Sequence, residues 1–413
     1  MKINIFALPT VIVINWLILV GVVLFPSDIY QQVIDEPYFA GLHGEMFAYM
    51  TLSLGLIWFG WIVAQPVHAP PPMTLVEYSP SFLWLLRSVG LFAPLLYGFR
   101  LFTSAEIQEA LYYELPMNEI RDIITEMSIN YLVQLAMVSS ILCIYLTANN
   151  RALRSIIDCL IVAIMIGCLL VTMQRSLLMP YILAIGVAYY QGQKQMTLLH
   201  TFFYGGCALL SGLCLFLLIA ELRQQEDVSL LQSILGYTVA SYNRLAVMLD
   251  GNLQLPNSGT GYYTLQWLYY PPVVRDILHI PDLAASVLGT HLPVTRLDNY
   301  YAQFEAIEKT PLAANFIWAT FFGIVYSDYG WLSLFFYVVF GACCQAAYIS
   351  MQKRKLLGIF LYSYIYATSL LWFGDGFIFQ STTLLICYMA LLYQFIALLF
   401  RYITSFNEQH VTQ

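Results

Sequence analysis

Charged residues are scarce in this sequence, and their scarcity excludes most classes of soluble protein. Lys and Arg number 17 and Asp and Glu 24 among 413 residues, so only 10% of the chain is charged. The net charge at pH 7 is −7, whereas a nucleic-acid-binding protein needs a basic face. We therefore expect no nucleic acid among the partners of this protein.

Metal-ligand and thiol-pair spacings are missing as well. None of the eight cysteines stands in a CxxC spacing with another, and no HExxH, paired-carboxylate or Cys/His ligand set is present. All eight cysteines lie within apolar segments, where a cysteine packs as a small apolar residue. We expect no cofactor and no tightly bound metal.

Long apolar segments fill most of the chain. Hydrophobic residues make up 60% of it, which is the composition of a polytopic membrane protein. Windows of about 20 apolar residues, each long enough to cross roughly 30 Å of hydrocarbon, can be drawn in ten places. These windows are residues 5–25, 45–64, 82–102, 129–147, 156–173, 177–190, 198–220, 329–350, 357–373 and 382–400. The sequence predicts an all-α integral membrane protein with about ten transmembrane helices in one polytopic domain, residues 1–413.

Basic residues in the short connections predict the orientation of these helices. If the ten windows alternate across the membrane, one side receives Lys2, Arg151, Arg154, Lys194, Lys353, Arg354, Lys355 and Arg401. An excess of Lys and Arg in short loops marks the cytoplasmic side. The long loop 221–312 then faces outward.

The long loop is where we expect the activity. It contains the candidate site residues Arg223, Arg244, Arg275, Arg296, His291, Asp298, Tyr242, Tyr263 and Tyr300. Guanidinium forks, titratable groups and flat aromatic rings together suit a phosphorylated sugar. Within the loop, residues 229–249 carry apolar side chains at helical spacing, which predicts an amphipathic helix against the membrane core with Arg244 beside the apolar stripe.

Two arginines outside the loop lie close to the membrane. Arg175 occupies a connection of only two or three residues between two windows, so its guanidinium needs a partner or an anionic ligand. Arg100, at the outer end of its window, is a second candidate for substrate binding. The alternative for both is an arginine that anchors the helix in the lipid headgroups.

The proton acceptor is left open by the sequence. Asp298 and Asp328 are favoured because each lies near the junction of the long loop with the following window. His279, His291 and Glu305 are the alternatives. Asp328 also has a purely structural interpretation, as the cap of a helix that starts near Tyr329.

The segments 314–316 and 326–332, Arg175-Ser176, and the run of Tyr237, Tyr242 and Gly261 resemble motifs of the oligosaccharide repeat-unit polymerases, the Wzy or O-antigen polymerase family. Ala314-Asn315-Phe316 followed by Tyr326-Ser327-Asp328-Tyr329-Gly330-Trp331-Leu332 resembles the signature that opens the span after the family's long periplasmic loop. Arg175-Ser176 resembles the arginine and serine pair before a short helix in that family and in O-antigen ligases. The run of Tyr237, Tyr242 and Gly261 is similar to the family's loop helix.

This resemblance implies a glycosyltransferase C-like enzyme of the bacterial inner membrane with its active site facing the periplasm. Such an enzyme moves a growing glycan from undecaprenyl pyrophosphate onto a new lipid-linked repeat unit, without a metal. Arg175 would bind the pyrophosphate, Arg244 would assist it, and Asn315 would lie in the substrate site. Membrane lipids surround such an enzyme, and the family implies a separate chain-length-regulating co-polymerase as a partner.

Two other functions stay open. An O-antigen ligase would transfer the glycan to the lipopolysaccharide core, but Ala314 stands where a ligase typically has a histidine. A flippase or transporter of lipid-linked oligosaccharides would also carry intramembrane arginines, but typically shows repeated halves.

Overall fold

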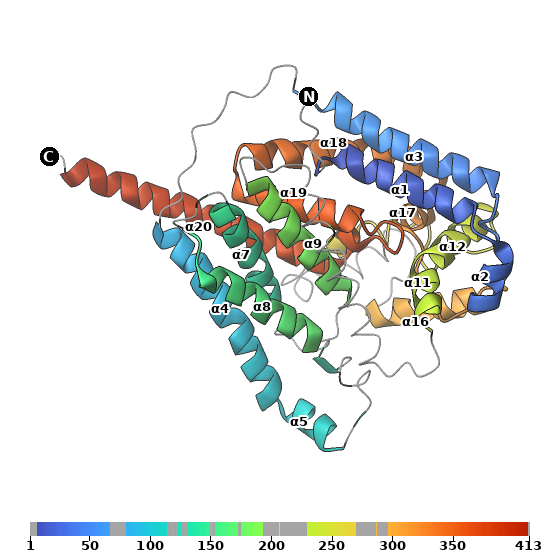
Figure 1. The fold of residues 1–413 in the computed structure, drawn as a ribbon, viewed down its shortest axis with the longest axis horizontal. Coiled ribbons are helices and arrows are strands. Elements are labelled where there is room, and N and C mark those ends of the chain that lie inside the picture. The colour runs from blue at the N-terminus through green and yellow to red at the C-terminus, as the bar shows by residue number, and fades with distance from the viewer. Residues whose placement is uncertain are drawn as a thin grey trace. The chain divides into compact units, whose positions relative to one another are not determined.

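The computed structural model describes residues 6–66, 80–113, 115, 120, 123–124, 131–148, 150, 153–171, 175–192, 206, 229–269, 286 and 296–411 (Figure 1). These residues form α-helices and short 3-10 helices, and no strand occurs among them. The prediction of an all-α protein is confirmed for this part of the chain.

Four described segments are long and apolar enough to cross a membrane. They are α3 (Gly44–Val63), α4 (Pro80–Thr103), α7 (Tyr131–Ala148) and the run 321–352, which comprises α17 (Phe321–Tyr329), η2 (Gly330–Leu332) and α18 (Ser333–Gln352). A fifth span results if α1 (Leu8–Val23) and α2 (Ser27–Ile34), which meet at 89°, count as one. The membrane character of the chain is thus confirmed.

The number of ten spans stays a prediction. Shorter apolar helices occupy four further windows: α8 (Ile156–Val171), α9 (Arg175–Gly192), α19 (Leu356–Ser369) and the part Leu385–Phe400 of α20 (Ser381–Val411). The window 198–220 lies outside the described residues except for Gly206.

The chain divides into two compact units, each assembled from separate stretches. The first unit comprises Met1–Val67, Asp227–Ala346 and Thr368–Leu384, and the second comprises His68–Glu226, Ala347–Ala367 and Leu385–Gln413. The first unit therefore contains most of the predicted outer loop as well as α1, α3 and α17. The single polytopic domain of residues 1–413 stays a prediction.

Close helix crossings build the first unit. Gly60 of α3 faces the backbone of Val338 on α18, and Gly341 of α18 faces the backbone of Ile57, so neither glycine has room for a Cβ atom. Small residues at such a crossing let two membrane helices approach until their backbones touch. On α1, the buried Asn15 donates from Nδ2 to the carbonyl oxygens of Val11 (3.0 Å) and Ser369 (3.1 Å).

A buried ion pair helps to hold the second unit. Arg87 of α4 meets Asp158 of α8 with Nε to Oδ1 and Nη2 to Oδ2 distances of 2.8 Å each. A forked guanidinium–carboxylate pair satisfies both buried charges at once. The opposite side of α4 is apolar and exposed, as at Phe92 and Phe99.

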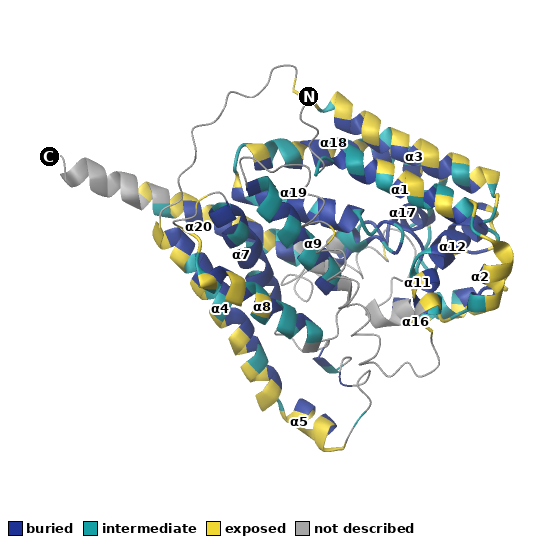
Figure 2. Ribbon diagram, viewed as in Figure 1, coloured by how far each residue is buried: buried dark blue, intermediate teal, exposed yellow. Residues whose placement is uncertain are grey.

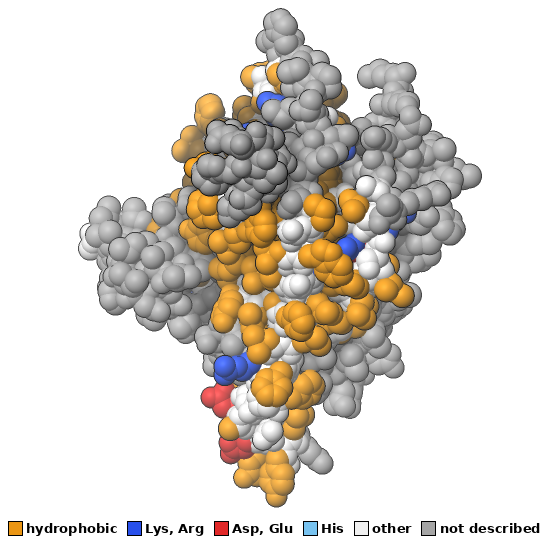
Figure 3. Space-filling view, turned by 90° about the vertical axis from the view of Figure 1, so that its left-hand side faces the viewer, with side chains coloured by type: hydrophobic (Ala, Val, Ile, Leu, Met, Phe, Trp, Pro, Cys, Tyr) orange, Lys and Arg blue, Asp and Glu red, His pale blue; other side chains and the backbone are white. Residues whose placement is uncertain are grey.

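The distribution of apolar side chains fits helices immersed in lipid. Exposed and buried positions alternate along α4 in Figure 2, and on the face shown in Figure 3 hydrophobic side chains cover most of the described surface. An apolar surface of that extent needs lipid or another protein to cover it.

Candidate functional site

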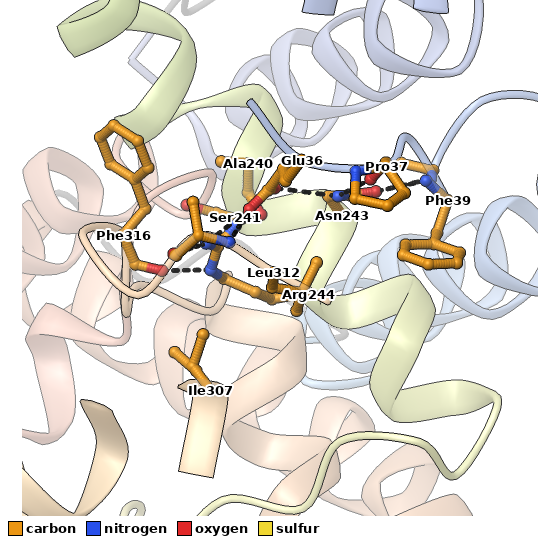
Figure 4. Close-up of polar contacts among 12 residues, drawn as sticks. Glu36, Pro37, Phe39, Ala240, Ser241, Asn243, Arg244, Ile307, Leu312 and Phe316 are labelled. Carbon is orange, nitrogen blue, oxygen red and sulfur yellow. Dashed lines mark hydrogen bonds and ion pairs between the residues drawn. The ribbon is translucent and has the colours of Figure 1, made fainter. Parts of the chain in front are cut away.

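The first unit contains a buried charge pair, Glu36 with Arg244 (Figure 4). Glu36 follows α2, and Arg244 lies on α12 (Val239–Leu249). Both side chains are fully buried, and the guanidinium meets the carboxylate in a fork of 3.0 Å (Nη1 to Oε1) and 3.1 Å (Nη2 to Oε2). A buried pair is tolerated only when its remaining donors and acceptors are also satisfied.

The other three donors of Arg244 go to backbone carbonyl oxygens. Nη1 donates to Ala240 at 2.8 Å, Nη2 donates to Ala313 at 2.7 Å, and Nε donates to Phe316. A guanidinium has five N–H donors in total, so all five have protein acceptors in this structure. The direct contact of Arg244 with a phosphate stays a prediction, and that contact would require at least one of these bonds to open.

Asn243 and Glu36 complete the cluster, which we call the Glu36 cluster. Asn243 accepts from the backbone N–H groups of Phe39 (2.6 Å) and Ala40 (3.0 Å), and its Nδ2 donates to Glu36 (2.9 Å) and to the Pro37 carbonyl (2.8 Å). Glu36 also accepts from Tyr30 Oη and from the Ala313 N–H (2.6 Å). The cluster therefore fastens three segments together: residues 30–40, α12 and residues 312–316.

The prediction of one amphipathic helix over residues 229–249 is wrong in two respects. The segment forms two helices, α11 (Leu230–Tyr237) and α12, which meet at Thr238 with φ −110° and ψ −80°. Every residue of α12 is buried, including both polar members of the cluster (Figure 2). The polar residues of this helix therefore face protein. Other members of the Glu36 cluster take the place of water as their hydrogen-bond partners.

A second buried carboxylate, Asp328, anchors the loop that follows α12. Asp328 lies near the end of α17 and is only 4% exposed. Its carboxylate accepts from the backbone N–H groups of Tyr263 (3.3 Å) and Thr264 (2.7 Å) and from the Thr264 hydroxyl (2.7 Å). The backbone N–H of Gly259 also donates to the Ser327 carbonyl at 2.9 Å. The loop 253–265 is thereby fixed to the end of α17.

Glycine permits the backbone course of this loop. Gly259 and Gly261 have φ values of +80° and +73°, in the region that residues with a Cβ rarely adopt. Asn257, which tolerates that region better than most residues, has φ +60° and donates to Asn299 of α16 (Arg296–Glu308) at 2.8 Å.

The Tyr263 side chain is buried in the anchored loop. Its hydroxyl donates to the Pro256 carbonyl at 2.7 Å and accepts from Gln303 Nε2 at 3.4 Å. Burial raises the pKa of Tyr263, and the negative charges of Asp328 and Asp375 raise it further, against hydrogen bonds that lower it. The phenol stays protonated as a donor, and both carboxylates lie within electrostatic range of it.

Five of the predicted site residues lie in the first unit with their side chains described. Arg244 and Asp328 are buried as described, and Tyr263 belongs to the anchored loop. Tyr242 is fully buried next to the cluster, and its hydroxyl has no hydrogen-bond partner among the described residues. Asn315 is exposed in the segment between α16 and α17.

The remaining predicted residues are placed only in part. Arg296, Asp298 and Tyr300 lie on α16, but their side chains are outside the described ones, and Arg223, Arg275 and His291 lie outside the described residues altogether. Arg100 is exposed near the end of α4, and Arg175 is the first residue of α9; both belong to the second unit.

Sequence reasoning did not single out Glu36, Asn243 or Asp375. Glu36 and Asn243 are single polar residues without a motif, so no pattern indicated their pairing with Arg244. Asp375 had a usable signal, because it is a carboxylate between two glycines in the short connection of two apolar windows. It is partly exposed, and its Oδ1 accepts from the Gly376 N–H at 2.6 Å.

Within the described residues, no group of three or more His, Cys, Asp or Glu side chains could hold a metal ion. No protein-family model, curated protein or solved structure matches the chain.

Proposed function

We propose that this protein is a membrane glycosyltransferase that polymerises lipid-linked oligosaccharide repeat units on the outer face of the bacterial inner membrane. One observation supports the proposal most: a polar, tyrosine-bearing loop is anchored on the buried Asp328, in the same unit as membrane-capable helices. Buried carboxylates and guanidinium groups are costly in such a protein and are usually retained for function. A polar loop in one unit with membrane-capable helices suits a substrate that has both a lipid part and a sugar part.

The proposed reaction joins two lipid-linked glycans. A hydroxyl of the incoming repeat unit attacks the anomeric carbon of the donor glycan, and the bond from that carbon to the pyrophosphate oxygen breaks. The hydroxyl proton passes to a protein base, and undecaprenyl pyrophosphate leaves with the bonding electron pair. The protein must stabilise the negative charge of the leaving group and accept one proton.

Arg175 is the residue to which we assign the leaving pyrophosphate. It is the first residue of the 18-residue helix α9, where the first-turn N–H groups have no acceptor within the helix. The positive end of the helix dipole favours an anion, and arginine is the residue type whose planar fork matches a phosphate. The position of Arg175 at the start of α9 supports this assignment.

The two carboxylates favoured by the sequence differ in their suitability as a base. Asp328 accepts three hydrogen bonds from residues 263–264, so its first task is to fix the loop. Asp298 lies on α16, one residue before Asn299, which binds the same loop. We therefore assign loop anchoring to Asp328 and proton acceptance to Asp298.

The surface polysaccharide of a deletion strain tests this proposal. Loss of a polymerase leaves single repeat units attached to the acceptor at the cell surface. Long polymer stranded on the lipid carrier would instead identify a ligase, and the absence of both from the surface would identify a flippase. An unchanged polysaccharide profile would refute all three functions.

A further inference from the structure

Three partly exposed aromatic side chains form a row in the first unit. Tyr237 is the last residue of α11, Trp318 lies in the extended segment before α17, and Phe377 begins η3 (Phe377–Phe379). The ring centroids of Tyr237 and Trp318 are 6.0 Å apart with planes at 32°, and those of Trp318 and Phe377 are 6.5 Å apart at 40°. We call this row the aromatic strip.

Buried contacts of neighbouring residues hold the segments that carry the strip. Phe316 lies against Gly236, where no Cβ would fit, and this contact places Trp318 beside Tyr237. In η3, Phe379 is buried and stacks on Phe321 with centroids 5.4 Å apart at 16°. Because Phe379 holds η3 in the core, Phe377 is left partly exposed two residues earlier.

The short segment that carries Asp375 borders the strip. Asp375 is two residues before Phe377 and lies between Gly374 and Gly376. A Cβ added to Gly374 would lie 3.7 Å from the Tyr237 carbonyl oxygen and 4.0 Å from the Phe377 ring, so the Asp375 segment borders both ends of the row. Asp375 Oδ2 accepts from Gln380 Nε2 at 3.5 Å, and the side chain remains partly exposed.

We propose that the aromatic strip, with Asp375, is a binding site for the acceptor glycan, on which a neutral sugar ring stacks while Asp375 accepts hydrogen bonds from its hydroxyls. This inference rests on the proposed function and adds the site of one substrate. Aromatic faces bind the apolar face of a sugar ring, and a few placed polar groups fix its orientation. The Asp375 carboxylate favours a neutral sugar, because its negative charge would repel an acidic sugar bound beside it.

A lipid chain is the alternative occupant. An aromatic row alone would suit an isoprenoid or acyl chain equally well. A partly exposed carboxylate next to hydrocarbon is costly, however, whereas next to a polyol it gains hydrogen bonds. Asp375 therefore favours the glycan.

The test measures binding of the purified, detergent-solubilised full chain to delipidated surface polysaccharide from the source cells by calorimetry. Trp318→Ala should lower the affinity by about 5- to 10-fold, the loss expected for one aromatic stacking contact. Trp318→Phe should retain most of the affinity, which separates stacking from misfolding. Trp58→Ala is the matched control, because Trp58 is an exposed tryptophan of α3 in the same unit and should not matter.

Each other outcome has a defined meaning. Equal affinity of wild type and Trp318→Ala would overturn the strip and leave the polymerase intact. A wild type that lengthens glycans yet does not bind the polysaccharide would also overturn the strip. A wild type that neither binds nor lengthens glycans would refute the proposed function together with the strip. If Trp318→Ala weakens binding of undecaprenyl phosphate vesicles but not of polysaccharide, the occupant is lipid and the inference is wrong.

Discussion

Replacing Glu36 with glutamine tests the Glu36 cluster with the least change in shape. The carboxylate accepts five hydrogen bonds, two of them from the fully buried guanidinium of Arg244. A glutamine would direct an NH2 group at one of these donors and leave Arg244 as an unneutralised buried charge. Removal of one partner of a buried pair costs about 3–5 kcal/mol, which corresponds to a fall in melting temperature of roughly 10 °C for a unit of ordinary domain size.

Thermal unfolding of the detergent-solubilised protein measures this change. Asp250→Asn is the matched control, since Asp250 ends the same helix and its contact with His43 (3.0 Å) is partly exposed. That variant should shift the melting temperature by at most a few degrees, because exposed ion pairs contribute about 0–1 kcal/mol.

A double variant identifies the cause of the loss. Glu36→Gln combined with Arg244→Gln should lose less stability than the sum of the two single variants, because the second change removes the charge left by the first. A melting temperature of Glu36→Gln equal to that of the wild type would refute the reasoning, and strict additivity would show that the two residues do not act as a pair.

Four further predictions concern activity and topology. Arg175→Ala should abolish chain extension at normal protein abundance, and Arg175→Lys should restore it poorly, since a point charge cannot replace a fork; wild-type extension by Arg175→Ala would contradict the assigned role. Asp328→Asn should weaken loop anchoring, seen as faster proteolysis within residues 253–265, and should lower turnover; unchanged proteolysis would contradict the anchoring role. Chain extension should survive EDTA because guanidinium groups neutralise the leaving pyrophosphate, and a loss reversed by a divalent ion would refute this. A membrane-impermeant thiol reagent should label Asp250→Cys from outside and Lys355→Cys only from inside; the reverse pattern would overturn the predicted orientation.

The membrane helices were predictable from the sequence because the length of an apolar run defines a span. The windows 45–64, 82–102 and 129–147 correspond to α3 (Gly44–Val63), α4 (Pro80–Thr103) and α7 (Tyr131–Ala148) within two residues at each end. Arg175 was predicted in the connection between two windows, whereas the structure places it as the first residue of α9; residues 172–174 lie outside the described residues.

The surroundings of the site residues were not predictable. Glu36 and Arg244 are 208 positions apart, and nothing in hydropathy or spacing pairs one carboxylate with one guanidinium at that separation. Helical periodicity in residues 229–249 indicated a helix with one wet face, but it cannot tell water from the buried polar partners that surround α12. The same limit applies to Asp328, whose three donors come from a loop without periodicity.

Reconstitution of the purified protein tests the central claim most directly. The protein alone, in liposomes supplied with the undecaprenyl-pyrophosphate-linked repeat unit of its source cell, should convert that substrate into a ladder of longer lipid-linked glycans and release undecaprenyl pyrophosphate. Unchanged single repeat units, with no carrier released, would contradict the claim that this chain is a repeat-unit polymerase.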